Sequence, residues 1–211
     1  DVRCTSNILV STNVSALTTG TMIQSWFAPS TEFVGSATGL VVSLMSDSDC
    51  DRVGNVTVSP FVSVTSSNRP LVIQAHDIEL SGFVSAGSSF VRIATCPGVT
   101  RTIDVGGSGL NAGDLRLSEF ELTMISAANM TIQTSGTGSS IQVYTVLASD
   151  VAGVSDRVTL DASPTGSAIS FLQTSEWRAL SALAGSGISV SGNISTTVSS
   201  LVLDGNADSA G

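Results

Sequence analysis

The eight residues Ile78-Glu79-Leu80-Ser81-Gly82-Phe83-Val84-Ser85 form a pattern that recurs at three other places in this 211-residue chain. The pattern reads aliphatic, any residue, aliphatic, Ser, turn-former, Asn or Phe, aliphatic, Ser. The other copies span residues 8–15, 56–63 and 188–195. Two copies begin 22 residues apart, at positions 56 and 78, and a period of that length is typical of stacked repeats.

The spacing of aliphatic residues predicts two short strands around a corner in each copy. Alternation with period two buries positions one, three and seven, and the Ser and turn-former between them favour a bend. Short strands rich in Val and Ile, separated by Ser and turn-forming residues, predict an all-β fold. The expected architecture is a parallel β-helix with about 22 residues per coil. A β-sandwich of short antiparallel strands is the alternative.

The repeat divides the chain into a less regular and a more regular part. Residues 1–55 contain one copy and then broken strands, so we expect irregular coils there and a lateral loop. Residues 56–211 are expected to form regular coils of one continuous solenoid. The stretch Glu176–Leu183 could be read as a short helix, but stacking on neighbouring coils favours strand.

Composition points to an extracellular structural protein. The net charge is -9, with 17 acidic residues against 8 basic ones, all of them Arg, so nucleic acid is not an expected partner. No uninterrupted apolar run reaches transmembrane length, and no membrane insertion is expected. The chain starts at Asp1 rather than Met, which suggests a processed or excised piece, and no polar cap follows the last repeat copy.

Three cysteines and four sequons fit the same compartment. Cys4, Cys50 and Cys96 should be oxidised outside the cell, but turns two coils apart lie beyond disulfide reach unless an irregular loop brings two of them together. We therefore expect at most one internal bridge, with Cys4 left for another chain or a neighbouring module. The glycosylation candidates start Asn-X-Ser/Thr motifs and are Asn13, Asn55, Asn129 and Asn193.

Few residues suggest chemistry. Asp47, Asp49 and Asp51 have the odd-position spacing of a calcium loop, but Arg52 stands where an EF-hand needs Gly, which favours a solvated acidic turn over a metal site. His76 has no Gly-X-Ser-X-Gly partner motif. We expect no catalytic residue and no cofactor.

We call the eight-residue pattern the template. Phe61 and Phe83 fill its sixth position in the copies that begin at residues 56 and 78. They are therefore interface candidates, expected to point outward, to stack on each other, and to be covered by a loop or a neighbouring chain.

Several stretches resemble the β-strand repeats of filamentous-haemagglutinin-type surface proteins. They are residues 77–82, 101–106, 187–194 and 201–208. The resemblance implies a right-handed parallel β-helix within a long secreted or surface-attached protein that serves adhesion or filament building.

The sequence thus predicts a structural or adhesive β-solenoid segment of a large extracellular filament or cell-surface protein, not an enzyme. Its expected partners are copies or further modules of the same protein, with surface glycans as additional partners. A carbohydrate-active β-helix, a polysaccharide lyase or hydrolase, is one alternative. An ice-binding β-helix is another.

Overall fold

The computed structural model describes the backbone of residues 2–3, 8–11, 14–17, 34–36, 41–108 and 113–207, and the side chains of residues 8–11, 41–108 and 113–207. Within these ranges there are 22 strands and one five-residue helix. All strand ladders in this part of the chain are parallel. The all-β prediction is confirmed, and parallel pairing excludes the antiparallel sandwich for the described residues.

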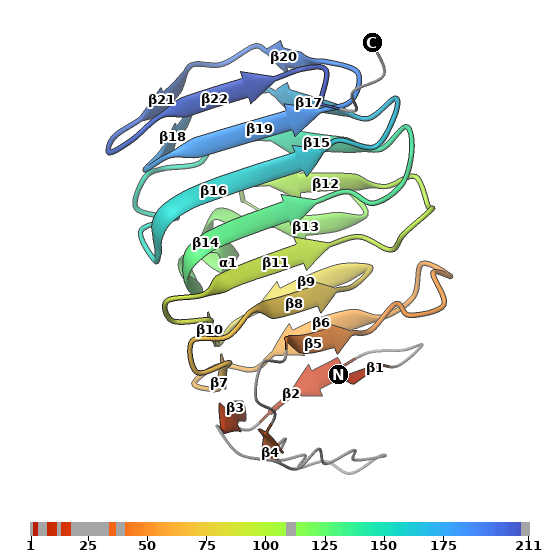
Figure 1. Cartoon of the computed structure of the whole chain (residues 1–211), viewed down its shortest axis with the longest axis vertical. Helices are drawn as coiled ribbons and strands as arrows, with labels where there is room; N and C mark the ends of the chain where they lie inside the picture. The colour runs from red at the N-terminus through yellow and green to blue at the C-terminus, as the bar shows by residue number, and fades with distance from the viewer. Residues whose placement is uncertain are drawn as a thin grey trace.

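Each coil, meaning one passage of the chain through the stack, visits three faces in turn (Figure 1). The longest ladder, sheet 1, runs along the whole stack. Its members, in spatial order, are β1 (Val2–Arg3), β5 (Val42–Met45), β8 (Leu71–Gln74), β11 (Phe90–Ala94), β14 (Ile125–Gln133), β16 (Val154–Ala162), β19 (Leu180–Ala184) and β22 (Leu201–Asp204).

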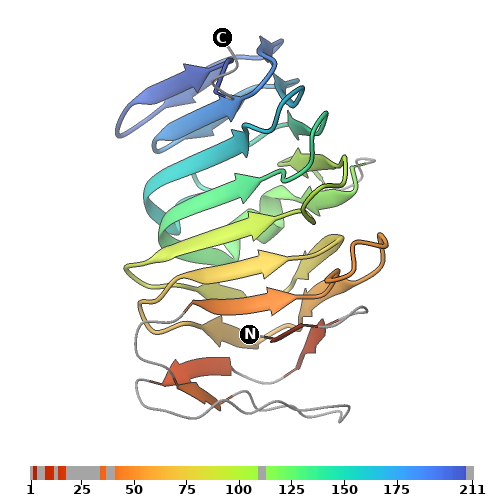
Figure 2. The ribbon, with the colours of Figure 1, turned by 45° about the vertical axis from the view of Figure 1, so that its right-hand side comes forward.

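The second face, sheet 2, is divided into two ladders. The lower ladder consists of β2 (Ile8–Val10), β6 (Asn55–Val58) and β9 (Asp77–Leu80). The upper ladder consists of β13 (Leu115–Leu117), β12 (Thr102–Val105), β15 (Ser140–Val143), β17 (Ala168–Phe171) and β20 (Ile188–Val190). Figure 2 shows the loops that join sheet 1 to sheet 2 along one edge.

The third face carries shorter strands. Its members are β4 (Val34–Ser36), β3 (Val14–Leu17), β7 (Ser63–Thr65), β10 (Phe83–Ser85), the first residues of β14, and the separate pair β18 (Ser175–Trp177) and β21 (Ile194–Thr196). β14 joins two faces, because its beginning pairs with β10 and its end with β11.

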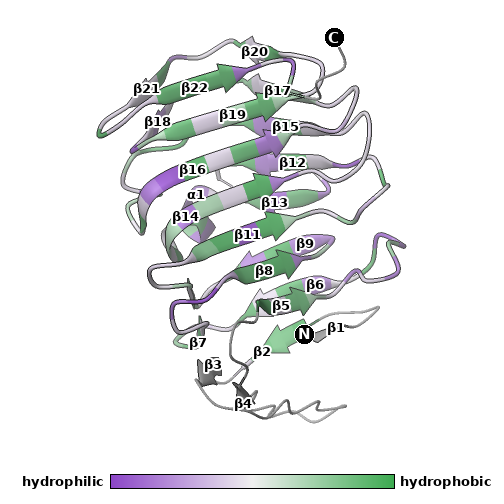
Figure 3. Ribbon diagram, in the orientation of Figure 1, coloured by the Kyte–Doolittle hydropathy of each residue, from purple (hydrophilic) through white to green (hydrophobic). Residues whose placement is uncertain are grey.

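The core consists of columns of aliphatic side chains that point into the stack. Template positions one and three fall in register where the template predicts it, with Val56 opposite Ile78 and Val58 opposite Leu80. All four side chains are buried. Further up, Ile141 lies opposite Ile169. Figure 3 shows hydrophobic residues in most of the strands that carry its colours. Each coil therefore covers the aliphatic layer of the one below.

The period is less constant than predicted. Val56 and Ile78 are 22 residues apart, but paired Ile169 and Ile188 are separated by 19 residues and paired Val42 and Leu71 by 29. The strands set the stacking, and the loops between faces absorb the difference in length, which is tolerated because loop closure depends only weakly on length.

The predicted stacking of Phe61 on Phe83 is wrong. Phe83 pairs with Ser63, because the turn after Val58 is two residues longer than the turn after Leu80. Phe61 sits inside that longer turn and is 99% exposed, so its ring has no stacking partner among the residues that the structure describes. Both rings do point outward, as predicted, since Phe83 is 57% exposed.

On sheet 2, one pair of the described strands is stacked in the reverse of its sequence order. β12 lies above β13, although it comes first in the sequence. The next strand along the chain, β13, lies one position lower than β12. Helix α1 (Glu119–Thr123) then turns the corner into β14.

Helix α1 was not predicted, although its sequence contains a start signal. Ser118 and Glu121 form a capping box, in which each side chain binds the backbone N–H of the other residue. By contrast, residues 176–177 and 180–183 lie in β18 and β19, so most of the stretch 176–183 is strand, as predicted.

The one disulfide among the described residues joins Cys50 and Cys96, with 5.6 Å between the Cα atoms. These residues follow β5 and β11, which are two positions apart in sheet 1. The irregular loop after β5 brings Cys50 within reach, as the sequence required. Cys4, Asn13 and most of the predicted lateral loop within residues 1–55 lie outside the described residues.

Candidate functional site

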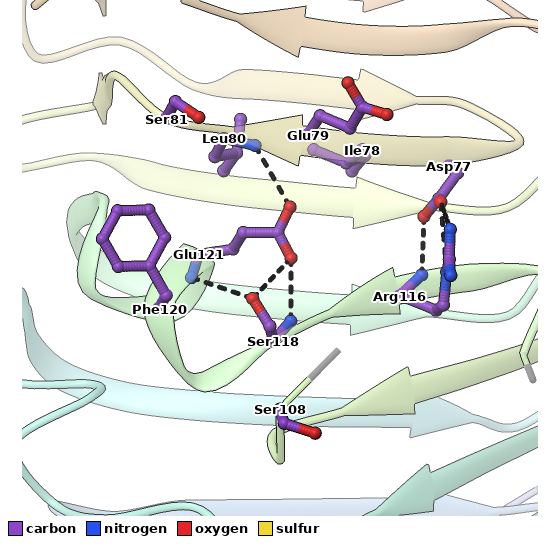
Figure 4. Close-up of a pocket in the computed structure, with 10 residues that line it drawn as sticks. All are labelled: Asp77, Ile78, Glu79, Leu80, Ser81, Ser108, Arg116, Ser118, Phe120 and Glu121. Atoms are coloured by element: carbon purple, nitrogen blue, oxygen red, sulfur yellow. Dashed lines mark hydrogen bonds and ion pairs between the residues drawn. The ribbon is translucent and has the colours of Figure 1, made fainter. Parts of the chain in front are cut away.

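A cavity of about 350 Å³ lies on sheet 2 between its two ladders, at the seam between β9 and β13. Because the chain loops back to place β13 beneath β12, β13 meets β9 without a backbone ladder. The cavity is lined by Asp77, Ile78, Glu79, Leu80, Ser81, Ser108, Arg116, Ser118, Phe120 and Glu121 (Figure 4). Its volume is at the lower end of the range for small-molecule sites.

Two carboxylates bridge this seam in place of main-chain hydrogen bonds. Asp77 Oδ1 accepts from the backbone N–H of Arg116 at 2.8 Å. Glu121 Oε1 accepts from the backbone N–H of Leu80 at 3.1 Å, and its Oε2 accepts from the Ser118 N–H and hydroxyl at 2.9 and 2.8 Å. These contacts satisfy buried donors that a continuous ladder would otherwise satisfy.

Asp77 also forms the ion pair of the cavity. Its Oδ2 accepts from Arg116 Nη2 at 2.6 Å and from Nε at 3.2 Å. The carboxylate of Asp77 raises the pKa of the Arg116 guanidinium above its ordinary value, first through this hydrogen bond and then through its charge. Such a two-bond contact fixes the orientation of the arginine.

Burial raises the pKa of Glu121 above its ordinary value, although the hydrogen bonds from Ser118 and Leu80 act in the opposite direction. Burial likewise raises the pKa of Asp104 on β12, where the N–H of Gly113 donates to Oδ2 at 2.7 Å. The loop lies so close to Asp104 that a Cβ at position 113 would collide with the carboxylate.

Glu79 has more capacity for a ligand than the other carboxylates of the cavity. It is exposed, and its Oε2 accepts from the Thr57 hydroxyl at 3.2 Å. The cavity rim adds the Phe120 ring, which is 54% exposed. Carboxylates only accept hydrogen bonds when ionised, so the site suits a ligand rich in donors.

The sequence did not single out the cavity residues Arg116, Phe120 and Glu121. The spacing of Ser118 and Glu121 marks a helix start and could have placed α1 at this corner. The approach of β13 to β9 depends on the reversal after β12, for which we find no local sequence signal.

The three aspartates with the spacing of a calcium loop lie close together. We call residues 47–51 the aspartate loop. One carboxylate oxygen from each of Asp47, Asp49 and Asp51 lies within 4.8 Å of the others. Asp47 is buried, however, and its Oδ2 lies 3.0 Å from Arg101 Nη2, whereas Asp49 and Asp51 are exposed. The arginine neutralises one of the three charges. The absence of a bound metal at this loop stays a prediction.

Arg101 links the aspartate loop to neighbouring coils through its side-chain contacts. The guanidinium is buried and also lies 3.3 Å from His76 Nδ1 and 3.6 Å from Asp114 Oδ1. His76 thus contacts a structural ion pair.

The sequons are unequal in exposure. Asn193 is exposed, while Asn55 and Asn129 are half-buried. Glycosylation at these sites stays a prediction.

Comparison of the chain with protein-family models, curated proteins and solved structures gave no match. In the described part of the chain, no helix has the length and apolarity needed to cross a membrane.

Proposed function

We propose that the chain is a right-handed parallel β-helix that serves as a structural or adhesive segment of an extracellular or cell-surface filament, without enzymatic activity. Right-handedness follows from the strong preference of parallel strand connections for that hand. The Cys50–Cys96 disulfide supports an oxidising compartment.

The observation that carries this proposal is the apolar surface of the last described coil. Leu201 and Leu203 of β22 continue the columns of Leu180 and Ala182. The lower pair is fully buried, whereas Leu201 and Leu203 are 39% and 43% exposed. On sheet 2, Val190 is 52% exposed although it lies opposite the fully buried Phe171.

Among the described residues, no further coil covers this aliphatic layer. Burying exposed aliphatic side chains beneath another coil is favourable, and an unpaired parallel strand edge can template a further strand. We propose that a second coil of the same kind, from another copy of the chain, stacks there and lengthens the filament.

Sedimentation of the chain over a range of concentrations tests this proposal. We expect reversible association through the open coil, and Leu203→Asp should abolish it because a charge would be buried in the joint. Val202→Asp is the matched control, because position 202 points to the other side of the same strand. A wild-type chain that stays monomeric at high concentration, or a Leu203→Asp variant that associates normally, contradicts the proposal.

A further inference from the structure

Phe61 combines two features that do not help the fold. It has φ of 64°, a left-handed conformation that is strained for most non-glycine residues, and its side chain is 99% exposed. The turn Ser59–Val62 is closed by a hydrogen bond from the Val62 N–H to the Ser59 carbonyl at 3.2 Å. With Pro60 at its second position, glycine would be the favoured residue where Phe61 stands. Strained residues cluster at binding and active sites, so a strained residue with an exposed aromatic ring points to a ligand.

Phe61 is the first of three exposed aromatic residues at the same corner of successive coils. The Phe83 N–H donates to the Val62 carbonyl at 2.9 Å, and the Val84 N–H donates to the Met124 carbonyl at the end of α1, also at 2.9 Å. Phe61, Phe83 and Phe120 therefore follow one another up the stack. Adjacent coils are separated by about 4.8 Å. We call these three residues the aromatic ridge.

The ridge leads into the seam cavity, because Phe120 and Ser81 line that cavity. The ionisable groups there are the carboxylates of Asp77, Glu79 and Glu121 and one guanidinium, Arg116. Three carboxyl groups against one cation disfavour a negatively charged ligand. The oxygens of Asp77 and Glu121 already accept from the chain, so Glu79 is the carboxylate that can accept from a ligand rich in donors.

We infer that the aromatic ridge and the seam cavity bind a glycan chain of uncharged sugars. The C–H faces of sugar rings pack on exposed aromatic rings, while sugar hydroxyls donate hydrogen bonds to carboxylates such as Glu79. The acidic cavity repels uronic-acid and sulfated chains. A protein partner fits less well, because the centres of protein interfaces are depleted of charged residues. This binding activity does not depend on end-to-end assembly.

The test is calorimetric titration of the chain with a panel of short oligosaccharides of glucose, mannose, galactose and N-acetylglucosamine, with uronic-acid oligomers alongside. We expect at least one uncharged oligosaccharide to bind and the uronic-acid oligomers not to bind. Phe61→Gly and Phe120→Ala should each weaken binding by about tenfold, as loss of one aromatic contact would.

Phe61→Gly is the sharpest variant, because glycine adopts the turn conformation without strain. It should keep or raise the melting temperature while it weakens binding, which a merely structural phenylalanine would not do. Phe90→Ala is the matched control, since Phe90 is 38% exposed but lies on β11 of sheet 1. Glu79→Gln keeps an acceptor, removes a charge, and should allow weak binding of the uronic-acid oligomers.

Three outcomes overturn the inference: no uncharged oligosaccharide binds, the ridge variants bind as the wild type does, or uronic-acid oligomers bind equally well. Repeating the titration with Leu203→Asp separates this inference from the proposed filament. Wild-type affinity in that variant shows that the ridge acts without assembly, whereas lost affinity in a folded variant contradicts its independence.

Discussion

The middle coils and the last described coil have the same strand pattern but different surroundings. Phe171 and Val190 are neighbours in one inward column, as are Leu180 and Leu201 in another. The first member of each pair is fully buried, and the second is open to solvent. The period-two pattern therefore determines which side chains point inward, but it does not determine whether another layer covers them. The difference between the two regions is the basis for proposing growth of the stack through this surface.

The largest effect should come from truncating the two members of one column. Phe171→Ala removes a fully buried ring and should lower the free energy of unfolding by about 3–5 kcal/mol. Val190→Ala, at low protein concentration, should change it by no more than about 0.5 kcal/mol. Urea denaturation of both variants measures the contrast. Equal losses would mean that the last coil is covered within the single chain.

Removing the disulfide should weaken the covered coils next most strongly. Cys50 and Cys96 close a loop with a sequence separation of 46 residues, and replacing both with Ala should lower the free energy of unfolding by about 2–4 kcal/mol. Thermal and urea unfolding, with the reduced wild type as a second reference, measure the loss. Cys4→Ala is the control and should unfold as the wild type does. An unchanged double variant would show that the bridge does not constrain the unfolded chain.

A smaller effect is expected at the seam and depends on pH. Because burial raises the pKa of Glu121 in the folded chain, the folded state holds this proton over a range of pH in which the unfolded state has released it. Its contribution to stability is fully present below the unfolded pKa and is lost as the pH rises through the folded pKa.

The measurement for Glu121 is the free energy of unfolding of wild type and Glu121→Gln at a series of pH values. The glutamine variant has no proton to lose, so it should gain stability relative to wild type as the pH rises above the ordinary glutamate range. Glu119→Gln, an exposed neighbour on the same helix, controls for the loss of charge. A difference that stays constant with pH would contradict the raised pKa.

Much of the stacking was predictable because it depends on local alternation. The template aligned Val56 with Ile78 and Val58 with Leu80, and it selected positions whose side chains are buried. The distance argument for the cysteines was also sufficient to require an irregular loop. These features follow from strand geometry and from the reach of a disulfide.

The register beyond the turns was not predictable from the template. Pro60 and Phe61 extend their turn by two residues, whereas Gly82 allows a tight corner, since a Cβ there would collide with carbonyl oxygens of Ser59 and Val62. Two copies that fit the same sequence template therefore form two different turns. Turn conformation, rather than the aliphatic pattern, decided that Phe83 lies opposite Ser63.

The candidate site was missed for a different reason. Its cavity arises where β13 returns beneath β12 and meets β9 without a ladder. Asp77 and Arg116 come from strands whose adjacency is a property of the whole topology. Only the capping box of Ser118 and Glu121 left a local signal, and it marks the helix rather than the cavity.

Hydrogen exchange of the backbone amides as a function of protein concentration tests end-to-end stacking most directly. Stacking predicts that those amides of Leu201–Asp204 that point away from β19 exchange rapidly in dilute protein and become protected as the concentration rises, while the amides of β16 stay protected throughout. Leu203→Asp should remove that dependence on concentration. Exchange in Leu201–Asp204 that is the same at all concentrations would contradict the account.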